Sequence, residues 1–199
     1  MKTWSEFAGL HPDLAEPGRK LLYQFGVGLG FLATTRPDGG PRLHPMHPMC
    51  PILIERGAFA FIVPSPKQRD LRRDGRYALH SFPCPDNEDA FYCSGRVRLL
   101  DDERSRAELG AVFVAERAQL GVPPPVPEDA LFEFLLDGCL LTRTAGHGDR
   151  SRSTRSGVTR ARPKSIRDHR PAAHPLNEHN AGAARLDTAT QQEHIYLAS

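Results

Sequence analysis

The chain has 199 residues, of which 39% are hydrophobic, and its formal net charge at pH 7 is +2. This length suits one globular domain of ordinary size together with an appendage. No apolar run reaches the roughly 18 to 20 residues that a membrane helix needs, and the N-terminus lacks the apolar stretch of a signal peptide, so we expect no membrane partner and a cytoplasmic location.

The N-terminal third predicts short helices followed by a β-hairpin. A proline and a glycine interrupt the helix-forming residues in PDLAEPGRKLLYQFG. Residues 30–36 are rich in β-formers, and the next four, PDGG, tolerate the positive φ values of a tight turn. We therefore predict a hairpin whose second arm starts near Arg42 and runs on into PILIE, followed by a third strand at 58–63.

The middle of the chain adds predicted strands at 76–82 and 91–100, a helix at 101–121, and a last strand at 138–144. The helix begins with acidic residues, continues with an apolar stripe and ends at a glycine. Because the first five strands lie close together in sequence, antiparallel pairing is favoured. The predicted fold class is mainly β with flanking helices, built as a closed or partly closed barrel.

Residues 150–199 differ from the rest in composition. They are basic, whereas residues 1–149 carry a small excess of acidic groups. The basic segment has no sustained apolar period and few aromatic residues, so burial cannot offset the entropy cost of ordering it. We predict a globular domain at 1–149 and a disordered tail at 150–199; an altered reading frame is another explanation for the abrupt change. Basic tails bind polyanions without sequence specificity, so nucleic acid is disfavoured as a dedicated partner.

The segment SPKQRDLRRDG, residues 65–75, combines a helix start with positive charge. Ser65 is a preferred N-cap residue, and Pro66 suits the first helical position. Lys67 and Arg69 then fall in the first turn, where unpaired backbone N–H groups already make the helix end positive. Two interpretations stay open: an anion such as a phosphate monoester binds there, or the cations only solvate a surface helix.

The stretch RLHPMHPMCP places His44, His47 and Cys50 three residues apart. Histidine and cysteine are zinc ligands, but successive side chains of a strand alternate between faces, so these three do not converge. The prolines remove ladder donors and leave the strand irregular, where a flat ring can lie against its backbone. We predict no metal site, and we interpret most of the cysteines as reduced packing residues.

Several motifs occur together in a fixed order: a strand, a turn with Pro-Asp-Gly, a second strand with His-Pro, a third strand, and Ser-x-Lys-x-Arg-x-Leu before Arg-Asp-Gly-Arg. They stand in FLATTRPDGGPRLHPMHP, AFAFIVPSPKQRDLRRDGRYALHSF and FYCSGRVRLLDD. In this order they resemble the FMN-binding split-barrel family, which is pyridoxamine 5'-phosphate oxidase-like. The resemblance spans residues 31–102 and implies a split β-barrel, antiparallel and Greek-key-like.

The chain departs from the true vitamin B6 oxidases of that family. Those enzymes have Arg-Lys in the phosphate segment and a substrate motif with Arg and His on a last strand. Here Pro66 precedes Lys67, and nothing aligns beyond Asp149. We therefore do not expect a vitamin B6 oxidase.

The resemblance implies a homodimer with FMN in two clefts at the subunit interface. The helix start would hold the phosphate, the second strand would pass along the isoalloxazine ring, and the later strand at 91–100 would approach from the other side. The cofactor-binding residues implied in this way are Leu43, His44, Pro45, Met46, Ser65, Lys67, Arg69, Tyr92 and Ser94.

The implied activity is that of an FMN-dependent oxidoreductase, with hydride transfer to or from a small organic substrate. His44 is the candidate catalytic residue, because its unperturbed pKa of about 6.5 allows either protonation state near neutrality. His80 is a second candidate, although a partly buried barrel histidine is the favoured interpretation. The alternative is a non-catalytic protein that binds or carries a flavin, the deazaflavin F420 or haem.

Overall fold

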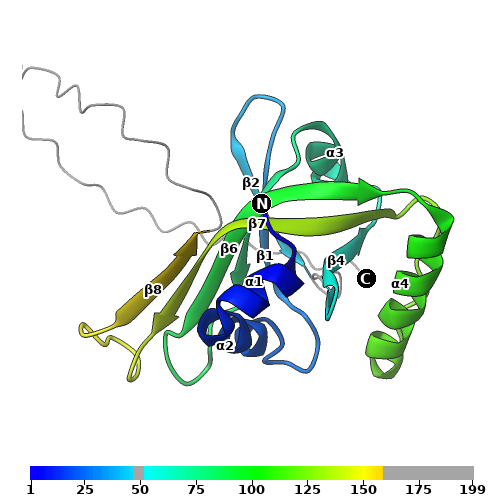
Figure 1. Ribbon diagram of the computed structural model, residues 1–199. Helices are drawn as coiled ribbons and strands as arrows, with labels where there is room; N and C mark the ends of the chain where they lie inside the picture. The colour runs from blue at the N-terminus through cyan, green and yellow to red at the C-terminus, as the bar shows by residue number, and fades with distance from the viewer. Residues whose placement is uncertain (47–51, 159–199) are drawn as a thin grey trace, which may run out of the picture. The chain divides into compact units, whose positions relative to one another are not determined.

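The computed structural model describes residues 1–46 and 52–158, which form an antiparallel sheet with helices packed on it (Figure 1). Within these residues the sheet has eight strands in the order β2-β1-β5-β6-β7-β4-β3, and β8 pairs with β7 beside that path. The path is open, because β2 and β3 are its two ends. The predicted class, an antiparallel split barrel with flanking helices, is confirmed. The strands are β1 (Gly30–Thr35), β2 (Pro41–Met46), β3 (Ile52–Ile54), β4 (Gly57–Ile62), β5 (Arg76–Ser81), β6 (Ala90–Leu100), β7 (Ala130–Arg143) and β8 (Ser153–Val158).

Two helices precede the strands of the sheet, and the other helical segments lie between strands. The helix α1 begins with a capping box, in which Thr3 and Glu6 exchange hydrogen bonds between side chain and backbone. The helix α2 continues through Pro17, so the predicted interruption lies between the two helices at His11 instead. Within the described residues, no helix is both long and apolar enough to cross a membrane; the cytoplasmic location stays a prediction. The helices are α1 (Trp4–Leu10), α2 (Pro12–Leu22), α3 (Pro66–Arg73), α4 (Glu103–Arg117) and a short 3-10 turn, η1 (Ala118–Leu120).

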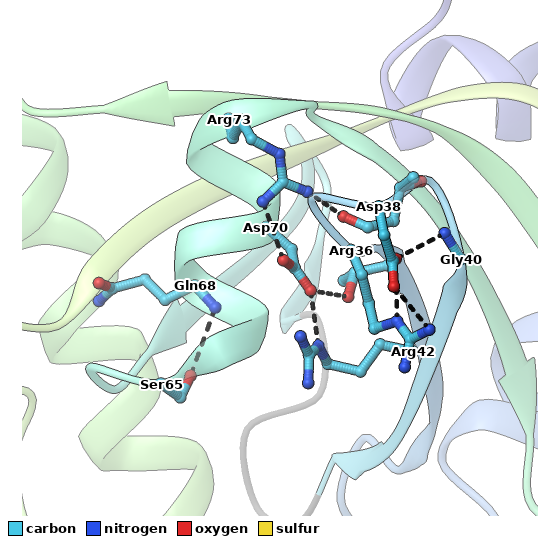
Figure 2. Close-up of polar contacts among 10 residues, drawn as sticks. Arg36, Asp38, Gly40, Arg42, Ser65, Gln68, Asp70 and Arg73 are labelled. Carbon is cyan, nitrogen blue, oxygen red and sulfur yellow. Dashed lines mark hydrogen bonds and ion pairs between the residues drawn. The ribbon is translucent and has the colours of Figure 1, made fainter.

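The predicted β1–β2 hairpin turns at PDGG. The Arg36 N–H donates to the Gly40 carbonyl (2.8 Å), and the Gly39 N–H donates back to the Arg36 carbonyl (3.0 Å). Gly39 has a φ of 83°, which side-chain-bearing residues rarely adopt. The Asp38 carboxylate accepts from the Gly40 N–H and from the Arg36 guanidinium, and this pins the turn (Figure 2). The turn fixes the register that pairs Leu32 with His44.

Strand β4 is buried on both faces, which explains why it is apolar throughout instead of alternating. Ala60 and Ile62 belong to the main core cluster of the barrel. Phe59 and Phe61 belong to a second cluster, which α4 covers with Phe113. The rings of Phe61 and Phe113 meet edge to face with centroids 5.7 Å apart.

The two longest strands, β6 and β7, contain a bulge. Their register shifts between Ser94 and Gly95. At this point the backbones approach so closely that a Cβ on Gly95 would lie 1.9 Å from the Leu135 carbonyl oxygen. Only glycine fits there, and a bulge of this kind bends the strand pair locally and increases its twist.

The C-terminal part of the sheet differs from the prediction in two ways. Strand β7 starts at Ala130, well before the predicted 138, and β8 lies inside 150–199, the segment predicted to be a disordered tail. Backbone pairing with β7 holds β8, whose side chains from Ser153 to Ser156 are exposed. The sheet therefore extends past the predicted boundary at 149, and residues 159–199 lie outside the described part.

We expect Gly95→Ala to lower the free energy of unfolding by about 3 kcal/mol, because the added methyl group overlaps a backbone oxygen that cannot move alone. Urea denaturation measures this change. Gly138→Ala is the matched control, since a Cβ there would meet its nearest atom at 3.6 Å, an ordinary contact. Equal losses from the two substitutions would contradict the steric explanation.

Candidate functional site

The helix α3 starts where the sequence predicts. Ser65 is its N-cap, with extended backbone angles, and Pro66 is the first helical residue. The Ser65 hydroxyl accepts from the Gln68 N–H (3.3 Å) and donates to the Val63 carbonyl (2.9 Å). No acidic residue lies in the first turn, so the positive end of the helix dipole has no counter-charge of its own there.

The first turn of α3 is anchored to the sheet by a buried amide. The Gln68 side chain donates to the Ile62 carbonyl at the end of β4 (2.7 Å) and to the Glu128 carbonyl just before β7 (3.1 Å). Leu71 on the next turn is buried in the main core. These contacts leave little freedom in the position of the helix start.

The buried carboxylate of Asp70 joins α3 to the β1–β2 hairpin (Figure 2). Only 2% of this residue is exposed. It accepts hydrogen bonds from Thr34 Oγ1 of β1 (2.9 Å), Arg42 Nε of β2 (2.8 Å) and an Arg73 terminal nitrogen (3.1 Å). Burial opposes ionisation, but the bonds from Arg42, Thr34 and Arg73 outweigh it and hold the pKa of Asp70 below its ordinary value.

The strand β2 presents alternate residues to opposite faces of the sheet. Arg42 and His44 pair with Thr34 and Leu32, both buried, on the inner face. Met46 follows on that face and is fully buried in the core. The outer face of β2 carries Leu43 and Pro45, which are exposed.

His44 lies next to the start of α3 and is only partly exposed. Its Nε2 atom is buried and has no hydrogen-bond partner among the described residues. Burial lowers the pKa of His44, and the positive charges of Lys67 and Arg42 lower it further, while Asp70 offsets part of the effect. The fold therefore places His44 of β2 close enough to Lys67 of α3 for the charge of Lys67 to act on it.

The two predicted phosphate cations differ in their surroundings. Lys67 is half-buried, and burial lowers its pKa. Its ammonium has no hydrogen bond or ion pair within residues 1–46 and 52–158. Arg69 is exposed on the same turn, and its guanidinium likewise has no partner in that part of the chain. Lys67 is thus the cation that faces His44, whereas Arg69 faces solvent.

Tyr92 and Ser94 lie on the outer face of β6, both partly exposed. Tyr92 is the register partner of His80, and Ser94 is that of Ala78. His80 is exposed instead of partly buried, which corrects the prediction, because the outer face of β5 is not covered there. Its Nδ1 lies 2.7 Å from the Ser81 carbonyl oxygen.

The predicted cofactor residues therefore divide into two sets. His44, Met46 and the start of α3 belong to the inner side of the sheet, and Leu43, Pro45, Tyr92 and Ser94 belong to the outer side. Sequence reasoning missed Arg42, Thr34 and Asp70. The signal available for Arg42 was its spacing of two residues from His44, which puts both side chains on one face of a strand. His47 and Cys50 lie outside the described residues.

No family model matches the sequence, and no curated protein is similar to it at a significant level. Solved structures do share the fold. A haem-binding protein from Mycobacterium smegmatis is 13% identical with a TM-score of 0.54, covering 71% of this chain and 57% of that protein. Two structures from Clostridium acetobutylicum have TM-scores of 0.50.

The first of these two is related to general stress protein 26 of B. subtilis, in the pyridoxinephosphate oxidase family. It is 13% identical, covering 78% of this chain and 96% of that protein. The second is a NimC/NimA family protein that is 18% identical. The match covers 73% of this chain and 96% of that protein. This chain thus spans little more than half of the haem-binding protein and nearly all of the other two. At such identities the comparisons establish the fold alone.

We expect Asp70→Asn to lower the free energy of unfolding at pH 7 by about 3 kcal/mol, because it leaves two arginines without their buried counter-charge. The pKa of Asp70 is lower in the folded than in the unfolded chain, so its contribution is present above the unfolded pKa of about 3.9 and is lost as pH falls through the folded pKa. Urea denaturation should show the difference from wild type shrinking below about pH 4.

Asp38→Asn serves as the control for this prediction. Asp38 pairs with Arg36 in the exposed hairpin turn, where solvent screens the charges. We expect little change in stability from this substitution. A loss as large as that of Asp70→Asn, or a pH-independent difference for Asp70→Asn, would contradict the role assigned to the buried carboxylate.

Proposed function

We propose that this chain, which has the split-barrel fold of the pyridoxamine 5'-phosphate oxidase-like proteins, binds FMN and works as a flavin-dependent oxidoreductase on a small organic substrate. The observation that carries the proposal is the excess of positive charge where α3 begins beside β2. There the positive charges of Lys67 and Arg42 both act on His44, and Asp70 is the one carboxylate among the described residues that opposes them. A phosphate monoester would supply the missing negative charge.

The residues at the helix start fit a phosphate. Lys67 offers its ammonium and also its backbone N–H, which has no acceptor among the described residues. Arg42 donates its Nε–H to the buried carboxylate, and its terminal N–H groups have no acceptor among residues 1–46 and 52–158, so they are available for an anion. Ser65 acts as the helix cap, because its hydroxyl proton already goes to a backbone carbonyl. Arg69, on the solvent side, would attract the phosphate at longer range.

FMN held in this way would supply hydride chemistry at its N5 atom. The protein's own groups would bind the phosphate, orient the ring and exclude water. The buried Nε2 of His44 needs a partner, and a polar atom of the ligand would provide one. An anion beside Lys67 and Arg42 would reverse their effect on His44 and raise its pKa, which favours the protonated imidazole in the loaded site.

Non-catalytic binding of haem, flavin or deazaflavin is the second candidate function. The same Nε2 atom favours it, since an unpartnered buried imidazole nitrogen is the kind of group that ligates haem iron. The M. smegmatis protein that shares the fold is described as haem-binding. An absorption spectrum of the purified protein separates haem from flavin.

We infer a homodimer from the division of the predicted cofactor residues between two faces. Tyr92 on β6 lies three strands away from β2, about 14 Å at the usual strand spacing, and on the opposite face from His44. One ring cannot reach both within one subunit. A second copy that docks its outer face against the helix start would complete the site. Leu43, 66% exposed on that outer face, supports the docking because it is a large apolar side chain left in water.

We expect Lys67→Ala to weaken FMN binding about tenfold or more and to leave riboflavin binding unchanged, because riboflavin lacks the phosphate. Quenching of flavin fluorescence measures both affinities. Arg104→Ala, which removes an exposed arginine from α4, is the charge-matched control and should change neither. Equal affinity of the wild type for FMN and riboflavin would refute the phosphate assignment.

Anaerobic reduction then separates an enzyme from a carrier. NADH or NADPH should bleach the flavin absorbance of the loaded protein, and His44→Ala should slow the bleaching by more than it weakens FMN binding. Dithionite serves as the positive control for reducibility. Flavin that responds to dithionite but to neither nucleotide would favour the carrier.

We expect the wild-type chain to be a dimer in solution and Leu43→Glu to shift it to the monomer with weakened FMN binding, because a charge on the outer face opposes docking. Size-exclusion chromatography with light scattering gives the masses. Val114→Glu, at an exposed apolar position on α4, should leave the dimer intact. A monomeric wild type that binds FMN at full affinity would overturn this inference.

A further inference from the structure

A pocket of about 330 Å³ lies at the opposite end of α3 from the flavin site. It opens between the last turn of α3, the turn at Gly75, and the strands β6 and β7. We call it the α3 C-terminal pocket. With about 1.5 Å of rise per residue, the eight residues of α3 separate it from Ser65 by about 12 Å. It is therefore distinct from the predicted phosphate site. The residues that matter below are Leu71, Arg72, Asp74, Arg96, Leu99 and Phe132.

The floor of the pocket is apolar. Leu71 and Phe132 belong to the main core and are almost fully buried, so only small parts of them line the pocket. Leu99 of β6 stands at its side and is 38% exposed, although it is a large apolar residue. A small apolar group placed on this floor would cover Leu99 and gain burial.

The carboxylate in the pocket wall is already neutralised. Asp74 accepts two hydrogen bonds from the Arg76 guanidinium, at 2.6 and 2.8 Å, and these hold the pKa of Asp74 at about 2. Arg73, on the same turn, is engaged by Asp70 and by the Thr35 carbonyl. These pairs leave the charge of the pocket to its remaining arginines.

Two guanidinium groups at the pocket make no hydrogen bond or ion pair to a carboxylate in the described part of the chain, although the charge of Arg96 also helps to lower the pKa of Asp74. Arg72 is exposed at the end of α3 and makes no hydrogen bond or ion pair there. Arg96 of β6 donates one N–H to the Asp74 carbonyl (2.9 Å), which fixes its direction and leaves other N–H groups open. Two cations with open donors above an apolar floor match an oxyanion joined to a small apolar body.

We propose that the α3 C-terminal pocket binds a small organic anion, with Arg72 and Arg96 on its carboxylate or phosphate head and Leu99 and Phe132 under its apolar body. The volume lies near the lower limit for small-molecule pockets, which restricts the body to about one ring. The proposal does not depend on flavin binding, because none of these residues belongs to the flavin site.

The test uses phenyl phosphate and benzoate as probes, with inorganic phosphate and formate as their separate head groups and phenol as the separate ring. Amide chemical shifts of the full chain locate the binding, and we expect the Gly75 and Val97 amides to move, since their backbones are bonded to each other at the pocket (2.8 Å). At least one of the two whole probes should bind more tightly than its head group alone and more tightly than phenol. Arg72→Gln and Arg96→Gln should each weaken that binding about tenfold, and Arg104→Gln on α4 should not.

Three results would overturn the proposal. The first is the absence of shifts at Gly75 and Val97 with both whole probes up to about 10 mM. The second is binding of inorganic phosphate as tight as that of phenyl phosphate, which would mean an adventitious ion only. The third is unchanged affinity in both arginine variants. Shifts confined to Ser65 and Lys67 would place the probe in the flavin site and would count against the pocket.

Discussion

The carboxylate of Asp70 is the point at which three elements of this fold meet. A charge in a protein interior is tolerated only where donors surround it, and here the donors come from β1, β2 and α3. The hairpin and the helix must therefore adopt one relative placement for the charge to be satisfied. That same placement sets Arg42 and His44 beside the start of α3 and leaves the cations there with too little negative charge. The assembly of this region and the anion binding that we propose for it therefore have one origin.

Local patterns were sufficient for most of the fold. Turn residues at PDGG and the Ser65-Pro66 helix start act within a few residues, so the sequence shows them directly. Strand β8 was not predicted because its exposed serine, threonine and arginine side chains form no apolar pattern. Backbone hydrogen bonds to β7 hold it in the sheet. The sequence also did not predict that β4 lies between two core clusters. An apolar run indicates burial, but it does not show which helix covers the second face of the strand.

The candidate site was predictable only where its parts are local. The cations at the helix start follow from their positions after the N-cap. The contacts of Asp70 with Thr34 and Arg42 join residues that are 36 and 28 positions apart, and no short pattern encodes them. The predicted site also included both Leu43 and His44, which are neighbours in sequence. On a strand, such neighbours point to opposite faces of the sheet. In the proposed homodimer, a second copy of the chain would bring the two faces into one site.

Strand β4 has a further consequence for how the chain folds. Its pairing partner β7 and its covering helix α4 both follow it in sequence, separated from it by α3, β5 and β6. A chain emerging from the ribosome therefore carries an apolar strand whose Phe59 and Phe61 are not fully covered until residues through Glu133 have been made. Contacts so distant in sequence form late, and an uncovered apolar strand is a site for association between chains. Rapid docking of α4 and β7 would thus protect the newly made protein from aggregation as well as complete its core.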